Sequence, residues 1–311
     1  MKYVDLHCDT LTVCCDSGLN LADCDLQTSF EKLKKSGCAA QCFAVFTEGA
    51  DAAVRFKKYS DFYFQSLKKH KIKAVLNYGQ LLSCAENGET GAVLTVENLG
   101  FINELSEIAA LAEAGVKMAS LVWNYENKFA YPNLVFENGL PQFLKRNKKG
   151  LKPLGREAVK LLDENKIIID ISHLSDGGTD EILCGRKIPL VASHSNSSSI
   201  NRCSRNLTDG QIKKIADCGG VVGVNFCKDF LGEGETFESV FRHIRRIVNV
   251  GGEDAVAFGS DFDGIPAPPH LEDCTKMPEL SAFLESRGVK GGLAEKLCFK
   301  NFARVFKEVC G

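Results

Sequence analysis

Residues 167–173 have the sequence Ile167-Ile168-Ile169-Asp170-Ile171-Ser172-His173, a nearly continuous apolar run that ends in a histidine. A strand with one solvent-exposed face alternates apolar and polar residues, whereas an unbroken β-branched run indicates burial on both faces. Strands of this kind occur in parallel sheets that helices cover on both sides. The run therefore predicts a central strand of an α/β sheet.

Seven further runs rich in β-branched and small apolar residues occur along the chain. Most of them are separated by segments whose apolar residues have helical spacing. The predicted strands are 2–7, 39–46, 92–97, 117–123, 167–173, 189–194, 220–226 and 255–261. The predicted helices include 30–36, 54–70, 104–114, 155–165, 209–217, 237–249 and 294–309. Eight alternating units favour a (β/α)8 TIM barrel, although an open doubly wound sheet is the alternative that the pattern leaves.

We expect residues 1–311 to form a single barrel domain, because no shift in composition marks a second one. The most polar stretch, 124–152, follows the fourth predicted strand and is interpreted as a long loop on the active face. Its basic run, Lys145-Arg146-Asn147-Lys148-Lys149, has no interleaved aromatic residues. We interpret this run as a solvated surface and expect no nucleic-acid partner.

The composition is that of an ordinary globular protein, with 44% hydrophobic and 25% charged residues and a formal net charge of -2. These values exclude a disordered, collagen-like or polycationic chain. No apolar run approaches the ~18 residues of a membrane-spanning helix, and Asp5 comes too early for a signal peptide. We therefore expect a cytoplasmic protein without membrane contact.

Fourteen cysteines are scattered along the chain without a C-x-x-C pair. Cys8, Cys42, Cys184 and Cys227 lie in or beside apolar runs, where a thiol behaves as a small hydrophobic group. We expect the cysteines to be reduced and structural rather than nucleophilic.

Side chains that bind metals gather at the carboxyl ends of the predicted strands. They are His7 and Asp9 after the first strand, Glu97 on the third, His173 on the fifth, His194 on the sixth and Asp261 on the eighth. In a barrel these ends form one rim, where the active sites of this fold lie. Residues two apart in a strand point the same way, so His7 and Asp9 should share one side while Cys8 points away.

Three imidazoles and several carboxylates suit zinc or a similar ion. Five ligands exceed the needs of one catalytic zinc, but two ions that share Glu97 would use them all. His7 and Asp9 would complete one site, and His173 and His194 the other. A water held between two cations would lose a proton near neutral pH and attack an acyl carbon.

Asp261 lies in the sequence Gly259-Ser260-Asp261-Phe262-Asp263-Gly264. We expect it to be the general base that takes the proton of this water and passes it to the leaving nitrogen. Asp263 is interpreted as an acidic turn residue or helix cap. Of the other histidines, His70 and His243 fall on predicted helices and are expected to face solvent, and His270 is expected to be a loop residue.

Six motifs in order resemble the membrane (renal-type) dipeptidase family, peptidase family M19 of the amidohydrolase superfamily, from Val4 to about Val309. They are Asp5-Leu6-His7-Cys8-Asp9-Thr10, the strand end at Glu97, Ile169-Asp170-Ile171-Ser172-His173, Ala192-Ser193-His194-Ser195, Arg205-Asn206-Leu207-Thr208-Asp209 and Gly259-Ser260-Asp261-Phe262-Asp263-Gly264. The resemblance implies a barrel of the metal-dependent hydrolase type that cleaves dipeptides. Some members favour a D-residue at the carboxyl-terminal position or accept β-lactam rings.

The resemblance also assigns roles to positions of this chain. It implies two Zn2+ ions bridged by Glu97 and a water or hydroxide, and the ligands His7, Asp9, Glu97, His173 and His194. Asp261 matches the proton shuttle and contacts substrate, and Arg205 matches the arginine that holds the substrate's terminal carboxylate, a role that suits a planar bidentate donor. A homodimer is the expected assembly.

Two positions depart from the family pattern. Trp123, in Leu121-Val122-Trp123-Asn124, stands where the renal enzyme has a histidine that contacts the substrate carbonyl. Its indole can donate a hydrogen bond but cannot act as an imidazolium, so the metal would be the main stabiliser of the oxyanion. Phe230 stands where a tyrosine is expected near the seventh strand. We expect both residues to contact substrate.

The sequence thus predicts a zinc-dependent dipeptidase, with L-X-D-X peptides as candidate substrates and a metal-bridging hydroxide as nucleophile. Another amidohydrolase, such as an N-acyl-amino-acid deacylase or lactonase, is the alternative enzyme and would not need a free substrate amine. A barrel that binds a peptide or metabolite without turnover is the alternative of another class.

Overall fold

Eight parallel strands close into a barrel in the computed structural model, which describes residues 2–311. The strands are β1 (Tyr3–Cys8), β2 (Cys38–Phe46), β4 (Gly91–Glu97), β5 (Val116–Ser120), β8 (Ile168–Asp170), β9 (Val191–Ser195), β10 (Val221–Val224) and β11 (Val256–Phe258). Each pairs with the next in this order, and pairing of β11 with β1 closes the ring. The predicted (β/α)8 TIM barrel is confirmed, and the open sheet is excluded.

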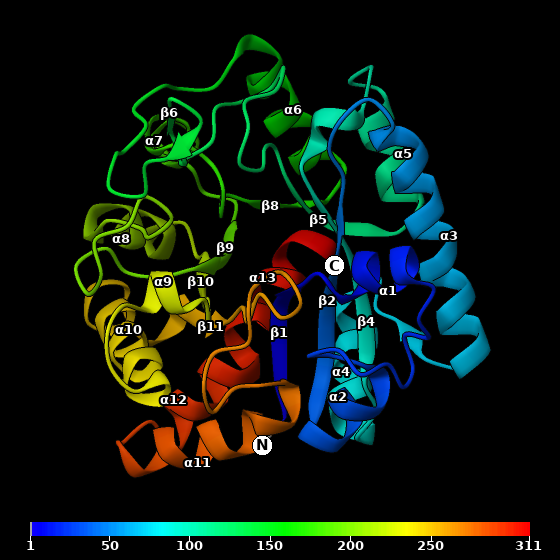
Figure 1. Cartoon of the computed structure of the whole chain (residues 1–311), viewed down its shortest axis with the longest axis vertical. Coiled ribbons are helices and arrows are strands. Elements are labelled where there is room, and N and C mark those ends of the chain that lie inside the picture. Colours follow the sequence, from blue (N-terminus) through cyan, green and yellow to red (C-terminus); the bar gives the residue numbers. More distant parts are fainter. Residues whose placement is uncertain (1) are drawn as a thin grey trace.

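Helices surround the strands, with α3 and α5 on one side and α8 and α10 on the opposite side (Figure 1). The α-helices are α1 (Thr10–Ser17), α2 (Phe30–Ser36), α3 (Ala52–His70), α4 (Tyr78–Asn87), α5 (Glu107–Glu113), α6 (Pro153–Glu164), α7 (Asp176–Leu183), α8 (Asp209–Asp217), α9 (Lys228–Leu231), α10 (Thr236–Gly251), α11 (Met277–Ser286), α12 (Gly292–Glu295) and α13 (Asn301–Cys310). Short elements complete the chain: β3 (Lys73–Ala74), the hairpin β6 (Phe136–Glu137) and β7 (Leu140–Pro141), the 3-10 helices η1 (Leu99–Phe101), η2 (Glu253–Ala255) and η3 (Cys274–Lys276), and the π-helix η4 (Lys296–Lys300).

Several strands end earlier than the sequence predicts. β8 ends at Asp170 rather than at His173, and β11 ends at Phe258 rather than at Asp261. In both cases the polar residues leave the hydrogen-bond ladder and form the loop at the rim. The apolar pattern continues past the ladder because these rim loops are themselves buried, as Ile171 and Phe262 are.

The barrel interior is packed at its amino-terminal end. One or two side chains from each barrel strand, such as Val4, Met118 and Ile168, form a cluster with Phe302 and Phe306 of α13. Burial of each large side chain contributes roughly 1.5–3 kcal/mol. Because α13 closes this end, a substrate reaches the interior from the opposite rim, where the polar strand ends lie.

His243 of α10 is completely buried, so the expectation that it faces solvent is wrong. Its Nδ1 accepts a hydrogen bond from the Ser197 amide at 3.1 Å, and its Nε2 donates to the Leu231 carbonyl at 3.1 Å. Burial lowers the pKa of His243 to about 4. Helical position alone did not predict this, because the histidine lies against Ser197 and Leu231, which are far from it in sequence or on another element.

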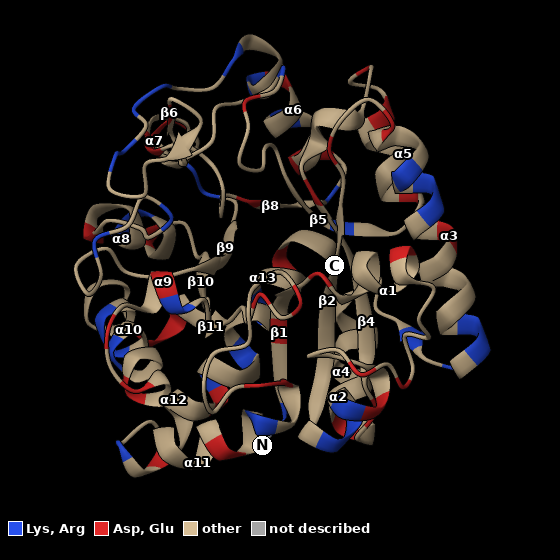
Figure 2. Ribbon diagram, in the orientation of Figure 1, with Lys and Arg blue, Asp and Glu red and all other residues tan. Residues whose placement is uncertain are grey.

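The lysines of the basic run after β7 are exposed to solvent, as expected, and residues of the run also form ion pairs with the protein. Arg146 lies 2.6 Å from the buried Asp176 carboxylate, Lys148 lies 3.1 Å from it, and Lys145 pairs with Glu137. Elsewhere acidic and basic residues are both spread over the outer helices and loops (Figure 2). The run therefore anchors the loop that follows β5.

All fourteen cysteines carry free thiols, and most are buried, although Cys184 is exposed against expectation. No helix within residues 2–311 is both long and apolar enough to cross a membrane.

Candidate metal centre

Six predicted site residues converge at the carboxyl-terminal rim of the barrel. They form three overlapping groups in which all potential ligand atoms lie within 4.8 Å of one another. The groups are Glu97 with His173 and His194, His7 with Asp9 and Glu97, and His7 with His194 and Asp261. Glu97 ends β4, His194 lies in β9, and Asp9 immediately precedes α1.

In the first group, the two histidines present the same ring atom to Glu97. Nε2 of His173 lies 2.9 Å from Oε1 of Glu97, and Nε2 of His194 lies 3.6 Å from it. The two Nε2 atoms are 2.9 Å apart. Three potential ligand atoms thus meet around one point.

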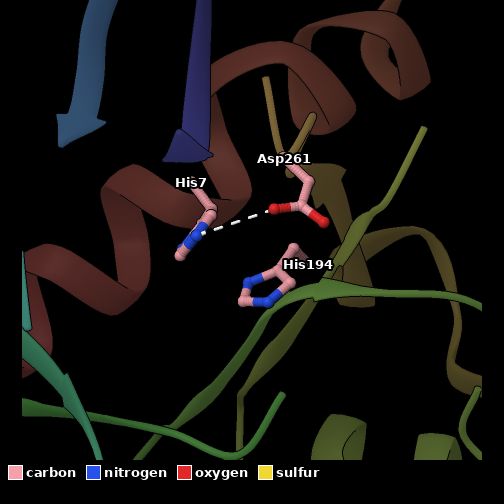
Figure 3. A group of neighbouring side chains, drawn as sticks. All are labelled: His7, His194 and Asp261. Carbon is pink, nitrogen blue, oxygen red and sulfur yellow. Dashed lines mark ion pairs between the residues drawn. The ribbon is translucent and has the colours of Figure 1, made fainter. Parts of the chain in front are cut away.

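His7 belongs to both other groups. Its Nε2 lies 3.5 Å from Asp9, 3.8 Å from Glu97 and 3.8 Å from Asp261. Figure 3 shows His7 and Asp261 facing one another beside the ring of His194. This Nε2 is buried and has no hydrogen-bond partner, which is unusual for a buried polar atom and fits an atom that binds a metal ion.

The electrostatics of the site favour a cation. Burial raises the pKa of Glu97 well above its usual range, with Asp9 and Asp261 adding to the rise. Burial lowers the pKa of His173 and of His194 well below the usual value, so both rings are neutral. His7 differs from these two rings: burial alone would lower its pKa, but the carboxylates of Glu97, Asp9 and Asp261 outweigh burial and raise it to about 10. The carboxylates therefore attract positive charge to the cluster, which a divalent metal ion can supply. The donor set therefore fits a metal centre.

Asp261 is held in place by its backbone and by a neighbour that the sequence analysis did not identify. Its φ of 65° is in the left-handed region, which is uncommon for a residue other than glycine. Nδ2 of Asn225 donates to Oδ2 of Asp261 at 2.8 Å, which leaves Oδ1 facing His7. Burial raises the pKa of Asp261 to about 6. Asn225 is a polar residue near the carboxyl end of a predicted strand. The other site residues were identified by that same position, so the sequence carried a signal for Asn225 as well.

Asp263 points away from this centre. Its carboxylate accepts hydrogen bonds from the Thr10 hydroxyl at 2.5 Å and from the Gln27 and Thr28 amides at 2.8 and 3.3 Å. These hydrogen bonds hold the loop before α2 in place, so Asp263 has the structural role that its interpretation as a turn residue implies.

A cavity of about 390 Å³ opens onto the cluster. Its walls include Asp9, Glu97, Trp123, His173, Arg205, Phe230 and Asp261, so predicted metal-binding and substrate-binding residues face one space. Cavities of this size hold small molecules.

Arg205 is the cation of this cavity wall. Its side chain is almost fully buried, its Nη2 lies 3.2 Å from Nε2 of His173, and its Nη1 donates to the Ser172 carbonyl. The guanidinium carbon lies 5.3 Å from the centre of the Phe230 ring. Phe230 therefore covers one face of the group that the sequence assigns to a substrate carboxylate.

Trp123 forms an aromatic wall on the other side. Its ring centre lies 4.6 Å from that of Phe46 and 6.2 Å from that of His173. Phe46, which ends β2, was not identified from the sequence, because an aromatic residue at a strand end is also typical of a core position.

Comparisons with known proteins agree with this geometry. A model of the membrane dipeptidase family, peptidase family M19, matches residues 1–310. An uncharacterized protein of the pqqA 5′ region of Klebsiella pneumoniae is 34% identical over 246 residues, which are 77% of this chain and 89% of that protein. An uncharacterized dipeptidase of Schizosaccharomyces pombe is 28% identical over 339 residues, covering 99% of this chain and 80% of its own.

Solved structures share the whole fold. A dipeptidase described as a metallo peptidase of family M19 has a TM-score of 0.92 and 25% identity, covering 100% of this chain and 99% of its own. A metallo peptidase from Rhodobacter sphaeroides, liganded with a phosphinate mimic of the dipeptide L-Ala-D-Ala, has a TM-score of 0.89 and 24% identity, covering 99% of each chain.

Proposed function

Because the chain belongs to the membrane dipeptidase family, peptidase family M19, we propose that its rim cluster binds two zinc ions and hydrolyses the peptide bond of dipeptides. The chain is a metal-dependent dipeptidase. The observation that carries the zinc proposal is the convergence of three histidine Nε2 atoms and three carboxylates beside a cavity of about 390 Å³. Asp9, Glu97, His173 and Asp261 line this cavity.

We infer that the ligands would be shared between two ions. His7 and Asp9 would hold one ion, His173 and His194 the other, and Glu97 would contact both. When bound, zinc would lower the pKa of water to near neutrality, supply hydroxide as the nucleophile and polarise the scissile carbonyl.

Asp261 would carry the proton between the two halves of the reaction. Its Oδ1 faces the cluster while Oδ2 is held by Asn225, so one oxygen is available to accept a proton from the attacking water. The same oxygen would then donate the proton to the leaving nitrogen. A carboxyl group with a pKa of about 6 can act in both directions near neutral pH.

Arg205 would bind the free carboxylate of the dipeptide. The buried guanidinium lies beside His173, so a bound carboxylate would lie within one residue's length of the cluster. This spacing favours dipeptides over longer peptides. L-X-D-X peptides are the first substrates to test, because the Rhodobacter protein binds a mimic of L-Ala-D-Ala.

Trp123 and Phe46 would contact an apolar side chain of the substrate. The other apolar residues of the cavity wall, among them Leu134, Phe143 and Ile265, extend this surface. Dipeptides with aliphatic or aromatic side chains therefore fit the cavity better than charged ones.

The proposal extends to the state of the protein. We expect residues 1–311 to act as one barrel domain, as a homodimer, in the cytoplasm. Sedimentation analysis of the purified chain and localisation of a tagged copy test these points.

The central experiment combines metal analysis with hydrolysis. We expect two zinc ions per chain, and turnover of an L-X-D-X panel that a chelator abolishes and zinc restores. Absence of both metal and turnover would contradict the proposal. Turnover of N-acetylated but not free dipeptides would indicate a deacylase, and tight peptide binding without turnover would indicate a binding protein.

A further inference from the structure

We propose that Asn124 and Ser193 are positioning residues that hold the protons of His173 and His194 on Nδ1, so that both Nε2 lone pairs face Glu97. The inference rests on the proposed function, since these Nε2 atoms are the expected zinc ligands. Neither Asn124, which lines the cavity, nor Ser193 supplies a ligand atom to the cluster. Each acts through the far side of a histidine ring.

The hydrogen bonds of His173 determine where its proton lies. An amide oxygen can only accept a hydrogen bond, so Nδ1 of His173, which lies 3.0 Å from Oδ1 of Asn124, is the donor and carries the proton. Nε2 is then free of a proton and can bind a metal ion.

His194 reaches the same state by a different route. Oγ of Ser193 lies 2.5 Å from Oδ2 of Asp170, a carboxylate that accepts hydrogen bonds, so the serine proton points to Asp170. Oγ of Ser193 must then accept at its 2.7 Å contact with Nδ1 of His194. The proton of His194 is thus also on Nδ1, and Nε2 is unprotonated.

Asp170 is well placed to fix the serine. It is almost fully buried, and its Oδ1 accepts from the Ser172 hydroxyl at 2.6 Å and from the Ser193 amide at 2.9 Å. The carboxylate has no other role in the proposed reaction. Its hydrogen bond to Ser193 explains why a buried acid lies beneath the rim without contacting the cluster.

The consequence is an arrangement that needs a cation. Two lone pairs meet across the 2.9 Å between the Nε2 atoms of His173 and His194, with Oε1 of Glu97 beside them. Without its partner, either ring could move its proton to Nε2 or rotate, and the ligand atom would be lost. Loss of such an outer partner typically weakens metal binding about 10- to 100-fold.

Zinc affinity of the full chain, measured without substrate by competition with a chromophoric chelator, tests the inference. Asn124→Leu keeps the branched shape of asparagine but has no acceptor, whereas Asn124→Asp keeps one. Ser193→Ala removes the acceptor for His194. Thr95→Val is the matched control, because Thr95 is a buried hydroxyl on β4 that donates to the Phe43 carbonyl and contacts no ligand ring.

We expect Asn124→Leu and Ser193→Ala each to weaken zinc binding at one of two sites by about 10- to 100-fold. Asn124→Asp should bind at least as tightly as wild type, and Thr95→Val should be unchanged. Long-range 1H–15N spectra of the metal-free protein should place the protons of His173 and His194 on Nδ1 in wild type, with a shift toward Nε2 for the affected ring in each variant.

Zinc affinity equal to that of wild type in both Asn124→Leu and Ser193→Ala would overturn the inference. An equal loss of zinc affinity in Asn124→Leu and Asn124→Asp would also overturn it. So would a loss in Thr95→Val as large as that in Asn124→Leu. Asn124 is only partly buried, so its variants carry the test even if Ser193→Ala does not fold. A wild-type protein that binds no zinc would instead contradict the proposed function, which separates the two failures.

Discussion

Gly264 lies so close to Asp9 that a Cβ atom on it would come within 2.1 Å of Oδ2 of Asp9. The same Cβ would lie 2.7 Å from Oδ1 of Asp261. The absence of a side chain therefore leaves room for two carboxylates of the centre. The glycine is needed here for space.

Gly264→Ala should displace the Asp9 carboxylate and weaken zinc binding at the His7 and Asp9 site, by about tenfold or more. Chelator competition measures the affinity, and kcat/KM should fall with it. Gly292→Ala is the control, because a Cβ there meets no atom within 4 Å. Equal effects of both substitutions would contradict the steric explanation.

Asp261→Asn should lower kcat by about 10²- to 10⁴-fold, because the amide cannot accept a proton from water. Substrate binding should be retained, since the side chain keeps its shape and its neighbour Asn225. Stopped-flow binding and steady-state kinetics separate the two effects. A variant with nearly wild-type kcat would assign the proton transfer to another group.

Arg205→Lys should lower kcat/KM for dipeptides by about 10- to 100-fold, mainly through KM, because one point donor replaces a planar fork. Dipeptides with an amidated carboxyl terminus provide the control. On these the variant and the wild type should differ little, and zinc content should be equal. A similar loss on both substrate types would show that Arg205 does not recognise the carboxylate.

Trp123→Ala should reduce selectivity for large apolar side chains. We expect the ratio of kcat/KM for Leu-containing to Gly-containing dipeptides to fall by about tenfold, as is usual for loss of an apolar contact in a pocket. Phe46→Ala should change the ratio in the same direction, because the two rings form one wall. An unchanged ratio in both variants would place the substrate side chain elsewhere.

His243 should make the stability of the metal-free protein depend on pH. Its folded pKa of about 4 lies below the usual 6.5, so between these values the unfolded chain binds more protons. The free energy of unfolding should therefore be fully retained above about pH 6.5 and decrease as pH falls toward 4, by up to about 3 kcal/mol. His243→Gln should lack this component in urea titrations at several pH values. If the free energy of unfolding depended on pH equally in wild type and His243→Gln, a contribution of His243 would be excluded.

Sequence alone predicted the barrel, with an open sheet as the alternative, and it predicted most of the residues that meet at the rim. Eight apolar runs separated by helical spacing predicted the strand number, and His7, Glu97 and His194 were found because the carboxyl ends of parallel strands share one rim. These inferences depend on periodicity and on the direction of the chain. Both are local properties that a sequence carries by itself.

Tertiary structure decided everything that depends on which side chains meet across the fold. Examples are the ends of β8 and β11 and the burial of His243. Others are the contacts of Asn124 with His173 and of Gly264 with Asp9, which bring together residues far apart in sequence. An asparagine in a loop or a glycine in a turn has the same local pattern whether or not it supports a metal ligand. Its role follows only from the atoms that packing places beside it.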